Sequence, residues 1–131
     1  MPSPITAPFA LAVALGAALG ALLRWLIGMW LNPVLTHFPL GTLAVNCLGG
    51  FLIGVALVWF SHAPNETLRL FLVTGVLGGF TTFSAFSAES LALLHKGRIE
   101  VMLAHTALHV LGSLACCWLG YRLMRAFIGN P

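Results

Sequence analysis

The sequence has very few charged residues: Asp, Glu, Lys and Arg make up 7% of its 131 residues. A soluble domain carries about 25%. No residue of these four types lies between Arg24 and Glu66. A stretch of nineteen uncharged residues separates Arg69 from Glu89, and one of twenty-one follows Glu100. This shortage of charge excludes an ordinary soluble domain and indicates an integral membrane protein.

Other features are also absent. The start, MPSPITAPFALAVALG, has no Lys or Arg before its apolar run, so we expect a retained helix rather than a cleaved signal peptide. The six Lys and Arg form no basic block, which argues against nucleic acid as a partner. Paired acids, a G-x-S-x-G motif and a phosphate-binding loop are missing, so we do not expect an enzyme. The three cysteines lie in apolar runs and are expected to be small buried hydrophobes.

The apolar residues, 60% of the chain, fall into long runs separated by short polar breaks. A membrane-spanning helix needs about 20 mostly apolar residues. The predicted spans cover residues 7–30, 40–60, 68–94 and 99–126. We therefore expect an all-α integral membrane fold with four transmembrane helices in one transmembrane domain, residues 1–131.

Small residues recur at four-residue spacing within these spans, a pattern that lets helix backbones approach closely in lipid. The positions are Gly16 and Gly20, Gly50 and Gly54, Gly75 and Gly79, and Gly112, Cys116 and Gly120. Packing is the better explanation for most of them.

Positive residues are almost balanced between the two expected membrane faces. Four spans place both termini on one face, with Arg69, Arg122 and Arg125. Lys96 and Arg98 belong to the other face, with Arg24 inside the first span toward it. Such a balance gives almost no orientation preference. Two oppositely inserted copies would then pair about an axis in the membrane plane, as an antiparallel, dual-topology homodimer.

The third span contains an unusually polar stretch, GGFTTFSAFSAES, at residues 78–90. Paired glycines and β-branched threonines lower helix propensity, so the third helix is predicted to break near its middle. Unwound backbone at membrane depth is where transporters coordinate ions. Phe80, Phe83 and Phe86 then recur every three residues beside Ser84 and Ser87. Phenyl edges are electropositive and, with serine hydroxyls, would attract a small anion.

Few other polar residues lie within the spans, and each is a candidate for function. Asn46 is either functional or a helix-to-helix hydrogen bond, whereas Thr42 is expected to satisfy itself against its own backbone. Arg24 either reaches to the interface or sets a positive potential at an anion path. Glu89 is either interfacial or paired with Arg24 or a histidine of the fourth helix.

His105, His109 and Ser113 follow one another at four-residue spacing and therefore line one stripe of the fourth helix. The sequence HTALH lacks the glutamate of the H-E-x-x-H zinc signature. A polar track for a small solute is the preferred interpretation, and metal binding is a minor alternative.

Three motifs together resemble the CrcB/Fluc family of fluoride channels: GALLRW in the first span, GTLAVNCLGGFLIG in the second and GGFTTFSAFSAE in the third. The resemblance covers essentially the whole chain. It implies a fluoride-selective channel in the bacterial inner membrane, through which fluoride leaves the cytoplasm passively. It also implies an antiparallel homodimer with two pores.

The resemblance also implies roles for individual residues. Phe83 and Phe86 match the family's phenylalanine pair, Asn46 its pore-facing asparagine, and Arg24 its first-span arginine. Ser87 matches a pore-lining serine. The fourth-helix track falls on His105, His109 and Ser113, where relatives often carry Tyr or Ser. A central sodium ion would be held by the backbone carbonyls of Gly78 and Thr81 from each subunit.

Two other functions remain open. A small coupled multidrug exporter shares the four-helix, dual-topology plan, but it needs a membrane-embedded carboxylate early in the chain. The first span carries Arg24 and no acid. A structural or assembly protein without transport activity would not need polar residues aligned on three spans.

Overall fold

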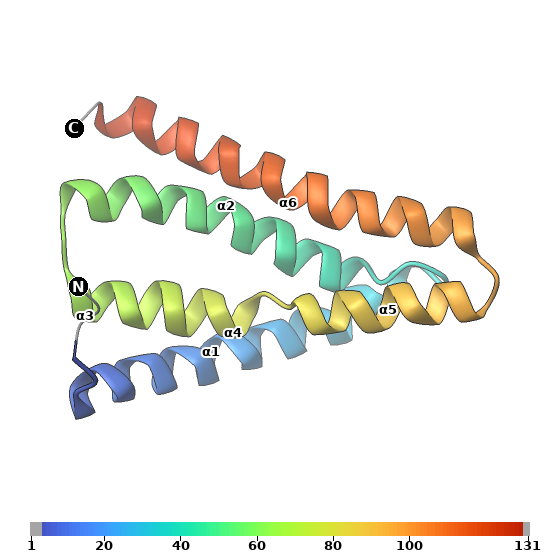
Figure 1. Cartoon of the computed structure of the whole chain (residues 1–131), viewed down its shortest axis with the longest axis horizontal. Coiled ribbons are helices and arrows are strands. Elements are labelled where there is room, and N and C mark those ends of the chain that lie inside the picture. Colours follow the sequence, from blue (N-terminus) through green and yellow to red (C-terminus); the bar gives the residue numbers. More distant parts are fainter. Residues whose placement is uncertain (1–3, 130–131) are drawn as a thin grey trace.

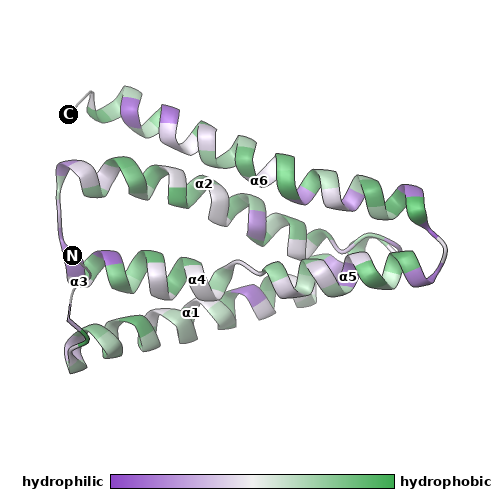
Figure 2. Cartoon of the chain, viewed as in Figure 1, coloured by the Kyte–Doolittle hydropathy of each residue, from purple (hydrophilic) through white to green (hydrophobic). Residues whose placement is uncertain are grey.

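The computed structural model describes residues 4–129. Within them, four helical stretches are long and apolar enough to cross a membrane: Ala7–Val34, Leu40–His62, Glu66–His95 and Ile99–Ile128. They match the predicted spans to within a few residues at each end. The hydropathy colouring shows apolar residues along most of each helix and hydrophilic ones at helix ends and within α1, α2, α5 and α6 (Figure 2). The chain is a multi-pass membrane protein of the all-α class.

The first two spans are long regular helices. They are α1 (Ala7–Leu31) and α2 (Leu40–His62), joined through the 3-10 turn η1 (Asn32–Val34). The fourth span is α6 (Ile99–Ile128). The third is divided into α3 (Glu66–Arg69), the π-helical segment η2 (Leu70–Leu77), α4 (Gly78–Phe80) and α5 (Phe83–His95).

The spans pack in two pairs, with α2 along α6 and α1 along η2 and α4 (Figure 1). The start of α1 and the end of α6 lie at the same end of the bundle as the α2–α3 connection (Figure 1). The α1–α2 and α5–α6 connections lie at the opposite end. The first and last described helix ends are therefore on one face, as the count of spans predicted.

Glycines bring both pairs of helices into backbone contact. A Cβ atom on Gly50 would lie 2.7 Å from the carbonyl oxygen of Ser113, so α2 and α6 touch through their main chains. Gly75 would meet Gly16 in the same way, its Cβ 2.9 Å from the Gly16 Cα, across the contact between η2 and α1. These approaches confirm the packing role predicted for the small residues.

Hydroxyl and amide side chains fix where several helices begin. Thr6 accepts a hydrogen bond from the Phe9 amide at the start of α1, and Asn65 accepts one from Leu68 at the start of α3. Asn32 caps α2 from the preceding connection, because its Oδ1 accepts from the amides of Gly41 and Thr42. Each cap satisfies an amide that has no partner inside its helix.

The predicted break in the third helix is confirmed, and it lies at Thr81 and Thr82. Both residues have extended backbone, with ψ of 157° and 117°. The glycine pair before them, expected to be part of the break, forms the helical turn α4 instead. Gly79 is needed there for packing, because a Cβ would lie 3.1 Å from the Ala17 Cα on α1 as well as against the Ala17 carbonyl. The π-helical turns of η2 were not predicted.

Candidate functional site

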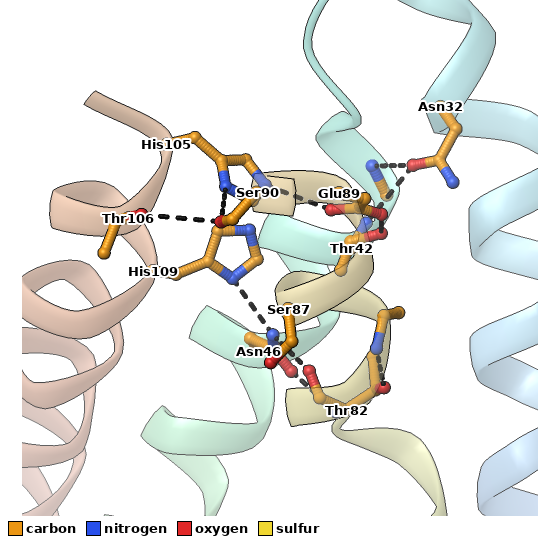
Figure 3. Close-up of polar contacts among 12 residues, drawn as sticks. Asn32, Thr42, Asn46, Thr82, Ser87, Glu89, Ser90, His105, Thr106 and His109 are labelled. Carbon is orange, nitrogen blue, oxygen red and sulfur yellow. Dashed lines mark hydrogen bonds and ion pairs between the residues drawn. The ribbon is translucent and has the colours of Figure 1, made fainter. Parts of the chain in front are cut away.

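The break is held open by the side chain of Asn46 on α2. The Thr82 amide donates to Asn46 Oδ1 at 2.8 Å, and Asn46 Nδ2 donates to the Thr82 carbonyl at 2.9 Å (Figure 3). One side-chain amide thus satisfies both main-chain groups of a residue that has left the helix. Such groups are costly when unpaired at membrane depth. Asn46 therefore stabilises the interruption itself.

Carbonyl groups at the break lose their usual helical donors. In a continuous helix the Thr82 amide would donate to Gly78 and the Ala85 amide to Thr81. Here the Thr82 amide donates to Asn46, and the Ala85 amide donates to Thr82 Oγ1 at 3.1 Å. The carbonyls of Gly78 and Thr81, the two predicted sodium ligands, are therefore released from these helical bonds.

The carbonyl of Gly79 has a partner from the first helix. Arg24 Nε donates to it at 3.0 Å. Arg24 and Glu89 both line a pocket of about 590 Å³ on the α1 side of the break. The arginine thus places a positive charge against the α4 end of the interruption.

A hydrogen bond from Asn46 fixes the proton position on His109. Asn46 Nδ2 lies 3.0 Å from His109 Nδ1. Since Nδ2 can only donate, Nδ1 must accept, and the neutral imidazole carries its hydrogen on Nε2. His109 Nε2 is buried and has no hydrogen-bond partner among the described residues. The fourth helix therefore presents an unused N–H donor at membrane depth.

A carboxylate joins the same polar group from α5. Glu89 accepts a hydrogen bond from the Thr42 hydroxyl and lies 3.0 Å, Oε2 to Nε2, from His105 (Figure 3). His105 is fully buried, and its Nδ1 lies 2.9 Å from Ser90 Oγ. Of the partners expected for Glu89, the structure shows a histidine of the fourth helix. Thr42 was expected to satisfy itself, and that expectation was wrong because Glu89 is within reach.

Aromatic rings border these polar groups. The rings of Phe83 and Phe86 lie 5.3 Å apart at an interplanar angle of 60°. Phe86 is buried against His105 and His109, at centroid distances of 5.4 and 4.8 Å. Phe83 is 76% exposed, so its ring projects from the face of this chain.

One pocket of about 460 Å³ gathers most of the predicted site residues. Its lining includes Asn46, Gly78, Thr81, Phe83, Phe86, His109 and Ser113. It therefore combines the loosened carbonyls of the break, the phenylalanine pair and part of the fourth-helix track. Residues from three spans meet here, although they are up to 67 positions apart in the sequence.

Three predicted residues lie outside that lining. Arg24 lines the pocket on the α1 side of the break, and His105 is enclosed with Glu89 and Ser90. Ser87 is exposed, and its hydroxyl donates to the Phe83 carbonyl at 2.8 Å. Ser90 was not predicted; its place directly after Glu89 in the polar stretch was the available signal.

Taken together, the interrupted helix and the polar pocket define a class of protein. Broken spans whose polar groups are covered by protein are found in membrane proteins that move ions or small solutes. The described part of the chain has this construction.

Comparison with known proteins identifies the family. Residues 11–121 match the family model described as CrcB-like protein, Camphor Resistance (CrcB). A protein of Aromatoleum aromaticum named fluoride-specific ion channel FluC is 48% identical over 124 residues, covering 93% of this chain and 95% of its own. A Pseudomonas aeruginosa protein of the same name is 49% identical over 122 residues, covering 92% and 96%. The chain belongs to the CrcB-like family.

Proposed function

We propose that the protein is a fluoride-selective channel that lets fluoride leave the cytoplasm passively and so reduces its toxicity. The observation that carries this proposal is the pocket where the Phe83–Phe86 pair meets His109 and Ser113. The relatives' shared name, fluoride-specific ion channel, agrees with it. The protein is a channel and not an enzyme.

The pocket supplies the interactions that a small dehydrated anion requires. Phenyl ring edges carry partial positive charge, and the tilt between Phe83 and Phe86 turns edge toward ring rather than stacking the two faces. His109 Nε2–H offers a buried donor that no described side chain occupies. Ser113 adds a hydroxyl further along α6. Each contact is weak, which suits conduction because the ion must also leave.

Asn46 and Arg24 act on this path indirectly. Both Nδ2 hydrogens of Asn46 already have partners, so its role is to hold Thr82 and to orient His109. Arg24 contributes positive potential at the end of the break while bound to Gly79. Ser87 and His105 extend the polar path beyond the pocket.

The proposed working form is an antiparallel homodimer in the bacterial inner membrane. Two features support it: the near balance of positive residues between the two membrane faces, and the exposure of Phe83 beside the polar break. A second copy would cover the pocket and exclude lipid from it.

A sodium ion fits the break as a structural cofactor at the dimer centre. Gly78 and Thr81 line the same pocket, and their carbonyls have lost their helical donors, which makes them candidate oxygen ligands. The ion would supply positive charge where two breaks meet. Both residues lie in the span that a partner copy would approach.

Reconstitution in liposomes tests the function directly. Fluoride-loaded liposomes carrying a potassium gradient are treated with a potassium ionophore, and fluoride and chloride release are followed with ion-selective electrodes. A channel gives fast, voltage-driven fluoride loss without chloride loss. Fluoride loss that requires a proton gradient or drug would favour a coupled exporter, and no fluoride loss would overturn the proposal. The coupled exporter is disfavoured because α1 carries no acidic side chain that could couple transport to protons.

A further inference from the structure

We propose that Glu89, His105 and His109 form a binding site for a divalent transition metal, with zinc as the best match, and that its occupation stops anion movement. One ligand atom from each of these residues lies within 4.8 Å of the other two. Two imidazole nitrogens and one carboxylate oxygen are a ligand set that zinc uses in proteins, with water in the fourth position. The HTALH spacing alone made metal binding a minor alternative; the carboxylate from α5 completes the set.

Two of the three ligand atoms already lie close to the separation that a small tetrahedral ion needs, and the third lies within 4.8 Å of both. Zinc–nitrogen and zinc–oxygen bonds of about 2.0–2.2 Å put neighbouring ligand atoms about 3.3–3.6 Å apart. His105 Nε2 and Glu89 Oε2 are already 3.0 Å apart. His109 Nε2 is buried and has no hydrogen bond to give up, and the proton that it carries must move to Nδ1 before it binds metal. Figure 3 shows both histidines projecting from α6 toward Glu89 on α5.

The surroundings hold the ligands in place. The His105 ring is packed between Phe38 and Phe86, each with a centroid distance of 5.4 Å. Its Nδ1 faces Ser90 Oγ, and a hydroxyl can rotate to accept the Nδ1 proton when Nε2 binds metal. The Thr42 hydroxyl donates to the other oxygen of Glu89. Metal-ligating side chains are commonly oriented by such outer contacts.

The ion has a route to the site. The Glu89 side chain is 19% exposed. It borders the pocket on the α1 side and a smaller one of about 250 Å³, which His37 and Lys96 also line. Both residues lie at the end of the bundle that carries the α1–α2 and α5–α6 connections. A cation entering there reaches the carboxylate before the buried histidines.

Metal binding would change the anion path through His109. When Nε2 binds metal, the remaining proton of the neutral ring must sit on Nδ1, where it meets the Nδ2 hydrogens of Asn46. Asn46 must then turn its oxygen toward His109 and give up its pair with the Thr82 backbone. Metal binding thus removes the free N–H donor of His109 from the pocket and breaks the hydrogen bonds by which Asn46 holds Thr82. This blocking effect rests on the proposed channel function, whereas binding itself does not.

The experiment measures binding and flux separately. Zinc chloride is titrated into purified protein by calorimetry, and fluoride efflux from liposomes is recorded with zinc chloride and then with excess EDTA. We expect saturable binding, at one zinc per chain, and a loss of efflux that EDTA reverses. In Glu89→Gln and in His109→Gln the zinc affinity should fall at least tenfold. His95→Ala, which removes an exposed histidine at the end of α5 outside the ligand set, should bind zinc as the unmodified chain does.

Cobalt chloride gives a second measurement on the unmodified protein, independent of how the variants fold. Visible bands of tetrahedral cobalt(II) that zinc displaces would support the site, and an octahedral spectrum would overturn it. Equal zinc affinity in the unmodified, Glu89→Gln and His109→Gln proteins would also overturn it. Efflux without zinc binding refutes the metal site alone, and zinc binding without any efflux refutes the channel function alone. Binding without effect on efflux overturns the blocking effect.

Discussion

Replacing Asn46 with alanine tests whether one side chain holds the third helix open. The substitution removes the acceptor for the Thr82 amide and the donors to the Thr82 carbonyl and His109. Side-chain hydrogen bonds in membrane proteins average about 0.6 kcal/mol, so the two bonds to Thr82 represent about 1.2 kcal/mol. If the Thr82 amide stays unpaired, its desolvation penalty of about 1–3 kcal/mol applies instead.

The Thr82 amide also has an alternative acceptor in the Gly78 carbonyl, its partner in a continuous helix. If the Thr82 amide returns to the Gly78 carbonyl, the smaller loss of stability applies. The helix then closes at the break, and the Gly78 carbonyl is no longer free. In either case we expect fluoride efflux to fall at least tenfold. The free energy of unfolding is measured by denaturant titration of the purified protein, and efflux is measured in liposomes.

Asn65→Ala is the matched control. It removes an asparagine that also binds a backbone amide, that of Leu68, but at the start of α3 and away from the pocket. Loss of this cap should cost about 1 kcal/mol and leave efflux unchanged. A folded Asn46→Ala protein that conducts fluoride as fast as the Asn65→Ala protein would refute the reasoning.

Three further predictions follow from the packing and the pocket. Phe83→Ile and Phe86→Ile should each cut fluoride efflux sharply while size-exclusion chromatography shows unchanged assembly; normal flux in both contradicts the role of the ring edges. Gly50→Ala should destabilise the chain by about 1–3 kcal/mol, because the new Cβ would meet the Ser113 carbonyl. Gly28→Ala is the control, because its new Cβ would lie 3.5 Å from the nearest atom, and it should leave the unfolding midpoint almost unchanged. Replacing sodium with a large organic cation during purification should lower the unfolding temperature, and an unchanged temperature would argue against the sodium site.

The sequence was sufficient for those features that depend on local patterns. Hydropathy located the four spans to within a few residues, because each span must match the bilayer thickness. The run GGFTT predicted a break, since its residues all disfavour helix. It did not predict that Gly78 and Gly79 stay helical, because the packing of α1 against Gly79 is a contact between distant parts of the sequence.

The contacts that complete the site could not be predicted in the same way. Asn46 and Thr82 are 36 positions apart, and Thr42 and Glu89 are 47 apart. Which side chains meet over such separations depends on the rotation of each helix about its axis, which spacing within one helix does not fix. Pairing of Glu89 with a histidine of the fourth helix was one of the alternatives that the sequence left open, and the structure shows that the histidine is His105.

The two side chains bound to the break, Arg24 and Asn46, both precede it in the chain. Ribosomes synthesise proteins from the amino end, so α1 and α2 exist before Thr82 is added. Arg24 and Asn46 are therefore already present when the third span is made, so the exposed main-chain groups of that span have partners available when it joins the bundle. His109 comes later, on the last helix, and its ring is oriented by an amide that is already in place. The order of the sequence thus protects the most vulnerable backbone of the protein while the protein is still being made.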